Sequence, residues 1–203
     1  MIAIINYGVG NLFSLSGSLK RLGIESVVTA DENVIRNADR IILPGVGAFG
    51  DAAEKLRKSG LDKVIIDEAK KGKPLMGICL GMQMLFEKSY EYGEHEGLGL
   101  IPGNVKPMKP LLDGKLKVPH IGWNSLQIKD KNDPLLKYIE EGDYVYYVHS
   151  FYATDCDAWI SSTSEYGITV TGSVRNGNVW GTQFHPEKSG EKGLLILKAF
   201  SEI

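Results

Sequence analysis

Apolar residues in the first eighty positions occur either in short runs or at a helical spacing. The short runs are typical of buried strands, which we predict at 2–6, 25–30, 40–45 and 73–78. The segments between them carry apolar residues three and four positions apart, and we predict helices at 12–22, 30–39, 52–58 and 61–71. Strands that alternate with helices in this way predict a central, mostly parallel sheet flanked by helices.

The second half of the chain has a different pattern, in which strand-like segments follow one another directly. They lie at 143–153, 158–167, 168–177 and 178–184. The Asn176-Gly177 pair is a strong hairpin signal, so we expect these segments to add antiparallel strands. A last helix is predicted at 191–203. Since no linker or internal repeat interrupts the pattern, we expect a single α/β domain over 1–203.

Composition limits the kinds of partner and setting. Of the 203 residues, 43% are hydrophobic and 24% are charged, which is ordinary for a soluble globular protein. The net charge of −2 gives no electrostatic argument for a nucleic acid or membrane partner, and no apolar run approaches the roughly 18–20 residues of a membrane span. The amino-terminal residues lack the basic start of a signal peptide. Two cysteines cannot form a disulfide framework, so a cytoplasmic setting is predicted.

A cysteine lies where a predicted strand meets an apolar helix, in PLMGICLGMQMLF at 74–86. Gly77 and Gly81 flank Cys79 in the G-x-nucleophile-x-G pattern, in which a sharp turn projects the nucleophile above the strand ends. Small residues are needed there because the strand and helix backbones come close together. The amide of Leu80 would face an oxyanion formed at such a turn. The alternative is a buried core cysteine, which is common.

One of the four histidines has the context expected of a catalytic base. His185, in VWGTQFHPEKS, follows an apolar strand, and Glu187 lies two positions later. Residues i and i+2 of an extended segment point to the same side, so the carboxylate is expected to bond one ring nitrogen while the other faces the thiol. Alone, this segment is more typical of a surface turn. In combination with the cysteine turn it favours a catalytic pair.

The segments GICLGMQMLF and GTQFHPEKS together resemble the signature pair of the class I glutamine amidotransferases, which use a Cys-His-Glu triad. The segments INYGVGNLFSL, LPGVGAFG, VPHIGWN and YVHSFYA resemble the glutaminase subunits of imidazole glycerol phosphate synthase, in the same order and across nearly the whole chain. This resemblance implies a flavodoxin-like fold and hydrolysis of glutamine. It assigns the catalytic roles to Cys79, His185 and Glu187.

The resemblance also implies where the oxyanion of the reaction binds. Its donors would be the amide of Leu80 and the amides of Val46 and Gly47 in the PGVG loop. Glycine lets a backbone approach a ligand closely. The loop is equally typical of an ordinary turn between a strand and a helix.

Further residues are implied to bind the substrate. Gln83 lies four positions after Cys79 on the predicted helix, so both face the same way, and in the family the corresponding glutamine contacts the substrate. A solvated helix position is its alternative. The loop of His149, Ser150 and Phe151 would hold the amino-acid end of the substrate. For His149 a buried core histidine is an equally good interpretation.

The resemblance implies a partner as well. Ammonia would pass through a tunnel to a (β/α)₈-barrel cyclase, with which the chain forms a heterodimer. No cofactor is implied, and the histidines and cysteines lack the spacing of metal ligands. The interface candidates come from YGVGN and PHIGWN, and they are Asn11, Pro119, His120, Trp123 and Asn124. Trp123 is equally compatible with a core position.

Three other functions fit parts of the pattern. A different triad glutaminase would share the chemistry but feed another synthase, such as one that makes pyridoxal phosphate or an aminated chorismate. A γ-glutamyl peptidase or cysteine hydrolase would need no partner. A non-enzymatic protein with an oxidisable turn cysteine would not react with glutamine analogues.

Overall fold

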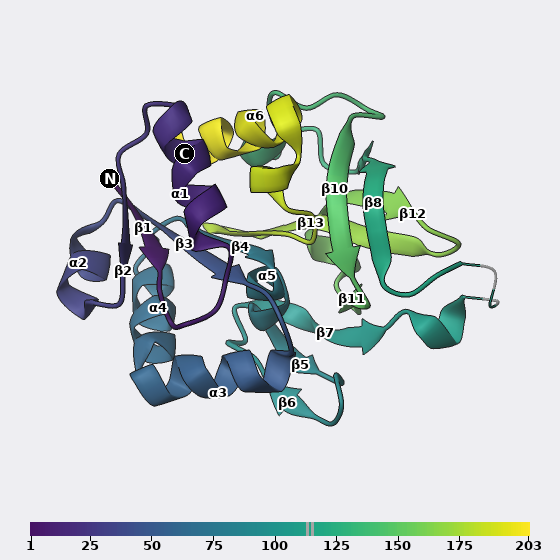
Figure 1. Ribbon diagram of the computed structural model, residues 1–203, viewed down its shortest axis with the longest axis horizontal. Coiled ribbons are helices and arrows are strands. Elements are labelled where there is room, and N and C mark those ends of the chain that lie inside the picture. Colours follow the sequence, from purple (N-terminus) through teal and green to yellow (C-terminus); the bar gives the residue numbers. More distant parts are fainter. Residues whose placement is uncertain (113, 115) are drawn as a thin grey trace.

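A computed structural model describes residues 1–112, 114 and 116–203 (Figure 1). Its largest sheet has eight strands in the order β2-β1-β3-β4-β14-β13-β12-β9. These strands are β1 (Ile2–Ile5), β2 (Ser26–Thr29), β3 (Arg40–Gly45), β4 (Leu75–Cys79), β9 (Gln127–Ile128), β12 (Ile160–Glu165), β13 (Thr169–Asn176) and β14 (Val179–Thr182). The first five strands of this order, β2, β1, β3, β4 and β14, pair in parallel. The remaining pairs, β14 with β13, β13 with β12 and β12 with β9, are antiparallel. The predicted fold class is therefore confirmed.

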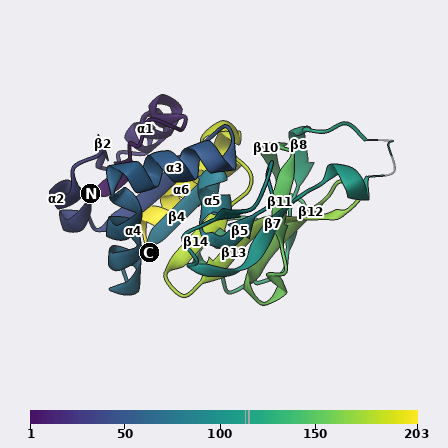
Figure 2. The ribbon, with the colours of Figure 1, turned by 90° about the horizontal axis from the view of Figure 1, so that it is seen from below.

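Helices cover both faces of the parallel strands (Figures 1 and 2). One face is covered by α1 (Leu12–Arg21) and α6 (Gly190–Ser201). The other is covered by α2 (Glu32–Asn37), α3 (Phe49–Ser59), α4 (Leu61–Lys70) and the short α5 (Leu80–Met84). Among the described residues, none of these helices is both long enough and apolar enough to cross a membrane.

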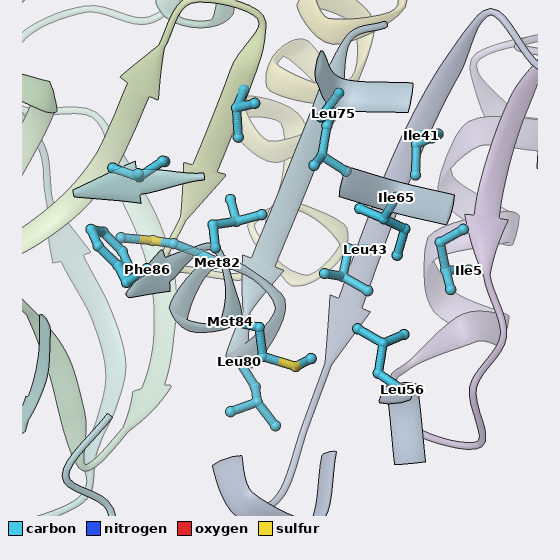
Figure 3. Close-up of a cluster of buried hydrophobic side chains, with 14 of the residues drawn as sticks. Ile5, Ile41, Leu43, Leu56, Ile65, Leu75, Leu80, Met82, Met84 and Phe86 are labelled. Atoms are coloured by element: carbon cyan, nitrogen blue, oxygen red, sulfur yellow. The ribbon is translucent and has the colours of Figure 1, made fainter. Parts of the chain in front are cut away.

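Side chains alternate between the two faces along each parallel strand. Ala3 and Ile5 of β1 belong to the core under α3, α4 and α5, whereas Ile2 and Ile4 belong to the core under α1 and α6. Figure 3 shows the first core, which includes Ile41, Leu43, Ile65, Leu75, Leu80 and Met82. Strands buried on both faces read as continuous apolar runs, so the sequence pattern identifies them.

The second half of the chain also forms two smaller sheets. One has the order β11-β7-β5-β6 and contains β5 (Phe86–Ser89), β6 (His95–Glu96), β7 (Ile101–Pro107) and β11 (Phe151–Thr154). The other pairs β8 (His120–Ser125) with β10 (Tyr144–His149) in antiparallel orientation, with His120 directly opposite His149. Short 3₁₀ helices lie at Lys109–Leu111, Pro134–Leu136, Asp157–Trp159 and Pro186–Lys188.

Among the boundaries that differ from the prediction, three stand out. The helix after β4 ends at Met84 and does not continue to Phe86, because Phe86 is fully buried as the first residue of β5. The segment predicted as one strand at 143–153 divides into β10 and β11, because its two halves pair in different sheets. The helix predicted at 52–58 already begins at Phe49, within the expected glycine-rich loop.

Candidate active site

Three neighbouring strands bring the predicted site residues to one edge of the sheet. β3, β4 and β14 are adjacent and parallel, so their carboxyl ends meet at the same edge, where open α/β sheets bind ligands. Val46 and Gly47 follow β3, Cys79 ends β4, and His185 lies shortly after β14. Residues far apart in the sequence therefore converge.

Cys79 lies in the sharp turn that the sequence predicts. Its φ of 55° and ψ of −111° are outside the regions that L-residues favour, and such conformations cluster at functional sites. A Cβ on Gly77 would lie 2.6 Å from the carbonyl oxygen of Gly81, and a Cβ on Gly81 would overlap the carbonyl of Leu43. The predicted need for small residues on both sides of the cysteine is confirmed.

His185 and Glu187 form the predicted hydrogen bond, but the predicted extended segment is wrong, because Pro186–Lys188 is a 3₁₀ helix that begins directly after His185. His185 Nδ1 is 2.8 Å from Glu187 Oε1, and the two side chains are 2% and 3% exposed, which excludes a surface turn. An ionised carboxylate only accepts hydrogen bonds, so Nδ1 carries a proton. Nε2 is therefore the ring nitrogen available for proton transfer. Within the described part of the chain, neither Nε2 nor the second carboxylate oxygen has a hydrogen-bond partner.

The charges around His185 favour its protonated form. Burial lowers its pKa, but the neighbouring Cys79 thiolate and the Glu187 carboxylate outweigh burial and raise the pKa to about 9. Since no hydrogen bond among the described residues joins Nε2 to the sulfur, we attribute this rise to the hydrogen bond with Glu187 and to the attraction of the imidazolium for the charges of Cys79 and Glu187. An imidazolium beside a thiolate can give its proton to a leaving amine.

A pocket of about 440 Å³ lies over the thiol. Ten of the predicted residues line it, namely Val46, Gly47, Cys79, Leu80, Gln83, Pro119, His149, Ser150, Phe151 and His185. The amide of Leu80, the first residue of α5, has no acceptor within the helix, and Gly47 has a φ of 91° that favours glycine. Across the described ranges, no group of three or more His, Cys, Asp or Glu residues is arranged to hold a metal ion.

The amide of Gln83 is engaged at the pocket wall. Its Nε2 donates to Phe151 O and to Gln183 Oε1, each at 3.0 Å, and its 4% exposure excludes the solvated alternative. Gln183, which the sequence analysis missed, is fully buried, and its Nε2 lies 3.8 Å from Cys79 Sγ. A signal was available, because Gln183 lies two positions before His185 in an extended segment and so points to the same side.

His149 borders the pocket, yet its ring belongs to the interior. The side chain is 6% exposed, its Nδ1 is 2.8 Å from Phe151 O, and its Nε2 is 3.0 Å from His120 Nδ1. Ser150 and Phe151 border the same pocket. The loop therefore faces a substrate, as expected, while the imidazole matches the core-histidine alternative.

Four further residues that were not predicted from the sequence line the pocket: Glu91, Tyr92, Val148 and Lys188. Glu91 Oε2 accepts from the backbone N–H of Phe49 at 2.8 Å, and burial raises the pKa of its carboxyl group. Lys188 directly follows Glu187, so its position could have been anticipated. Glu91 and Tyr92 lie in a loop without periodicity, which gives no signal.

The amino-terminal YGVGN segment supports the loop after β3. The Tyr7 hydroxyl donates to Pro44 O at 2.8 Å, and a Cβ on Gly10 would lie 3.0 Å from the Pro44 ring. Burial, and to a smaller extent the charge on Cys79, raises the pKa of Tyr7, so its hydroxyl stays protonated and can donate. The segment expected to contact a partner therefore also fixes the start of the PGVG loop.

The five predicted interface residues occupy different environments. Trp123 is 55% exposed, so the core alternative is excluded. His120 is 2% exposed, so the prediction that it contacts a partner directly is wrong: it occupies an inward-facing position of β8. Asn124 lies on the same inner side of the strand. Pro119 is exposed and borders the pocket, and Asn11 is the residue before α1.

Comparison with known proteins identifies the class to which this site belongs. The family described as "Glutamine amidotransferase class-I" matches residues 3–201. The chain belongs to this family. Solved structures with the same fold include one titled "Crystal structure of glutamine amidotransferase" (TM-score 0.76, 18% identity, 100% of both chains). PurLQS from Thermotoga maritima is similar (TM-score 0.76, 22% identity, 98% of this chain and 96% of that chain).

Within this family the similarity is more specific. The imidazole glycerol phosphate synthase subunit HisH of Listeria monocytogenes serotype 4b (strain CLIP80459) is 49% identical over 203 residues, which cover 100% of this chain and 96% of that protein. Its counterpart from Wolinella succinogenes is 48% identical over 205 residues, which cover 100% of both. These relatives confirm the resemblance inferred from the motifs and place the chain among the HisH subunits.

Proposed function

We propose that this chain hydrolyses glutamine to glutamate and ammonia at Cys79 and supplies the ammonia to a cyclase subunit. The cyclase would use it to form imidazole glycerol phosphate and aminoimidazole carboxamide ribotide in histidine biosynthesis. The observation that carries the proposal is the strained cysteine turn beside the buried His185–Glu187 pair, at a pocket of a chain 49% identical to a HisH subunit.

The reaction would proceed in two steps. Cys79 Sγ attacks the carboxamide carbon of glutamine, and His185 gives its Nε2 proton to the departing nitrogen, so that ammonia leaves and a thioester forms. Water, deprotonated by His185, then cleaves the thioester and releases glutamate and the thiol. Glu187 holds Nδ1 and stabilises the imidazolium throughout.

The oxyanion of each tetrahedral intermediate would bind backbone amides. Leu80 supplies one from the start of α5, and the loop of Val46 and Gly47 supplies the other. Losing one such donor typically costs about 10²–10³ in rate. Because Tyr7 holds Pro44 at the start of this loop, it would help to keep the second donor in place.

The charges around the pocket suit an amino acid as substrate. Glu91 contributes a carboxyl group and Lys188 an ammonium group to the lining of the pocket. A carboxylate complements the α-ammonium of glutamine, and an ammonium complements its α-carboxylate. Ser150 and Phe151 would hold the same end of the substrate through backbone and hydroxyl groups.

The partner would dock on the exposed side of the β8–β10 sheet. Ile121, Trp123 and Tyr144 are 59%, 55% and 58% exposed there, and aromatic anchors are typical of interface centres. We propose a heterodimer with a barrel-shaped cyclase in the cytoplasm. Ammonia would travel to it through an enclosed channel, because free ammonia is protonated in bulk water and lost to the synthesis.

The test is to mix the purified chain with a cyclase subunit and its phosphoribulosyl-formimino substrate. Glutamine-dependent imidazole glycerol phosphate is the expected product. Cys79→Ala should abolish this product but leave synthesis from added ammonia intact, since that step belongs to the cyclase. No product with glutamine, or rapid glutamine or peptide hydrolysis by the isolated chain, would contradict the proposal and favour a partner-free hydrolase.

A further inference from the structure

A continuous series of polar contacts runs from β8 to the catalytic sulfur, and the mechanism above does not use its first half. Asn124 Nδ2 lies 3.4 Å from His120 Nε2. His120 Nδ1 lies 3.0 Å from His149 Nε2, and His149 Nδ1 lies 2.8 Å from Phe151 O. The two histidines face each other directly across the β8–β10 pairing.

The last acceptor of this series, Phe151 O, determines which atom donates and which accepts in each contact. Phe151 O can only accept, so His149 Nδ1 must donate, and the Nε2 of a neutral His149 must accept. His120 Nδ1 is then the donor to His149, which leaves His120 Nε2 to accept from Asn124. Both rings are neutral near pH 7, since burial lowers the pKa of His120 to about 4 and that of His149 to about 3.

The series continues from the Phe151 carbonyl to the sulfur. Gln83 Nε2 donates one hydrogen to Phe151 O and the other to Gln183 Oε1, each at 3.0 Å. Gln183 Nε2 in turn lies 3.8 Å from Cys79 Sγ. The carbonyl that His149 holds therefore also holds Gln83, and Gln83 orients the amide that faces the thiol.

His120 is itself held in place by stacking. Its ring lies between Tyr147, at 4.8 Å and 20° between planes, and Tyr166, at 3.9 Å and 22°. The Tyr147 hydroxyl is fixed in turn by Ser164 Oγ at 2.8 Å. A ring confined between two others has one available plane, which directs Nδ1 toward His149.

We propose that His120 is a positioning residue for the glutaminase reaction, which donates to Nε2 of His149, fixes the orientation of that ring and thereby holds the Phe151 carbonyl, Gln83 and Gln183 around the thiol. It would act without touching the substrate. The inference rests on the proposed function, because glutamine hydrolysis is the reaction that it affects.

Two substitutions separate this role from simple packing. His120→Phe keeps an aromatic ring between the tyrosines but has no nitrogen, so His149 Nε2 loses its donor. His120→Asn has an amide N–H close to the position of Nδ1 but loses the stack. Each variant is measured in the complex with the cyclase, with glutamine and separately with added ammonia.

The positioning role predicts that His120→Phe lowers kcat/KM for glutamine by about 10- to 100-fold, since a mutation away from the chemistry that misplaces a group by about 1 Å can cost about 10²-fold, with ammonia-dependent synthesis unchanged. His120→Asn should recover most of the loss. The proposal is overturned if His120→Phe retains wild-type glutamine use, or if His120→Asn is the more damaged of the two, because packing would then be the role of His120.

A second readout does not depend on turnover. In ¹⁵N NMR of the labelled chain, His149 should carry its proton on Nδ1 in both proteins, because Phe151 O accepts from it. The signal of the unprotonated Nε2 should move downfield in His120→Phe, because this nitrogen loses its donor. An unchanged Nε2 signal would overturn the inference. Failure of the wild type to use glutamine with a cyclase would instead refute the proposed function, so the two failures can be told apart.

Discussion

At the scale of single residues, Cys79 is held in a conformation that costs free energy, whereas the charged form of His185 is stabilised by its neighbours. The backbone of Cys79 lies in a sparsely populated region, which typically costs about 1–3 kcal/mol. His185 is buried, yet two negative neighbours favour its charged form. The strained turn places the sulfur where glutamine hydrolysis needs it, and packing of β4 and α5 offsets its cost.

The pH profile of glutamine hydrolysis should report the state of His185. Activity requires the imidazolium as the proton donor to ammonia, so it should fall as pH rises through the raised pKa of about 9. Glu187→Gln removes a charge that raises this pKa, so the alkaline limb should move to lower pH. Steady-state rates across alkaline pH measure the shift, and a limb that stays in place would show that Glu187 does not stabilise the imidazolium.

The contacts of Gln183 needed spatial information, although its spacing from His185 is local. The motif around Cys79 and the i, i+2 spacing of His185 and Glu187 are local, so the sequence predicts both. The contact of Gln183 with Gln83 joins positions 100 apart, and its contact with Cys79 joins positions 104 apart. No local pattern encodes such contacts.

At the scale of elements, a strand could be predicted from the sequence when its side chains pack against helices, and not when its buried polar side chains bond one another. The strands β1, β3 and β4 are buried on both faces between helices, so they appear as apolar runs. The inner side of the β8–β10 sheet contains His120, Asn124 and His149, whose polar side chains are satisfied by one another. Such a strand looks solvent-facing in the sequence, which is why His120 was wrongly assigned to the interface.

The close approach of α5 to β3 should make Gly81 intolerant of any side chain. Gly81→Ala would drive a Cβ into the Leu43 carbonyl, so α5 must move and carry Cys79 with it. We expect a stability loss of about 1–3 kcal/mol and loss of glutamine hydrolysis. Denaturant unfolding and glutaminase assays measure both effects.

Gly17→Ala is the matched control. Gly17 lies within α1, where a Cβ would meet nothing within 4 Å. Helix propensity then predicts a gain of about 0.5–1 kcal/mol with unchanged activity. Equal effects of the two substitutions would refute the argument from close approach.

At the scale of the whole molecule, neutral buried histidines link stability to pH. His120 and His149 have pKa values lowered to about 4 and about 3, against 6.5 for an unperturbed histidine. Between these values and 6.5 the unfolded chain binds more protons, so acidification destabilises the fold. His185, whose pKa is raised from 6.5 to about 9, acts in the opposite sense: the folded chain already holds this proton and the unfolded chain takes it up near pH 6.5, so acidification through this window adds stability and offsets part of the loss.

We therefore expect the free energy of unfolding to fall by about 2 kcal/mol between about pH 7 and about pH 5. Urea titrations at the two pH values measure it. His120→Phe removes one titrating group and should reduce the difference. A stability independent of pH over this range would show that the two histidines are not held neutral.

Docking of the cyclase should depend on Trp123. Trp123→Ala removes a half-exposed aromatic side chain from the outer side of β8, and the loss of such an anchor typically costs about 2 kcal/mol or more, which weakens Kd by roughly 30-fold. Titration calorimetry with the cyclase measures this change. Val28→Ala, on β2 at the opposite edge of the main sheet, should have no effect. Equal affinities of Trp123→Ala and the wild type would place the interface elsewhere.

The central claim is that Cys79 is the nucleophile that attacks glutamine, and covalent labelling tests it most directly. Cys156 is an internal control, because it is 2% exposed and burial raises its pKa to about 11. After treatment with a diazo-norleucine analogue of glutamine, mass spectrometry should find one adduct, on Cys79, that excess glutamine prevents and His185→Ala greatly slows. An unmodified Cys79, or an adduct on Cys156 instead, would contradict the account.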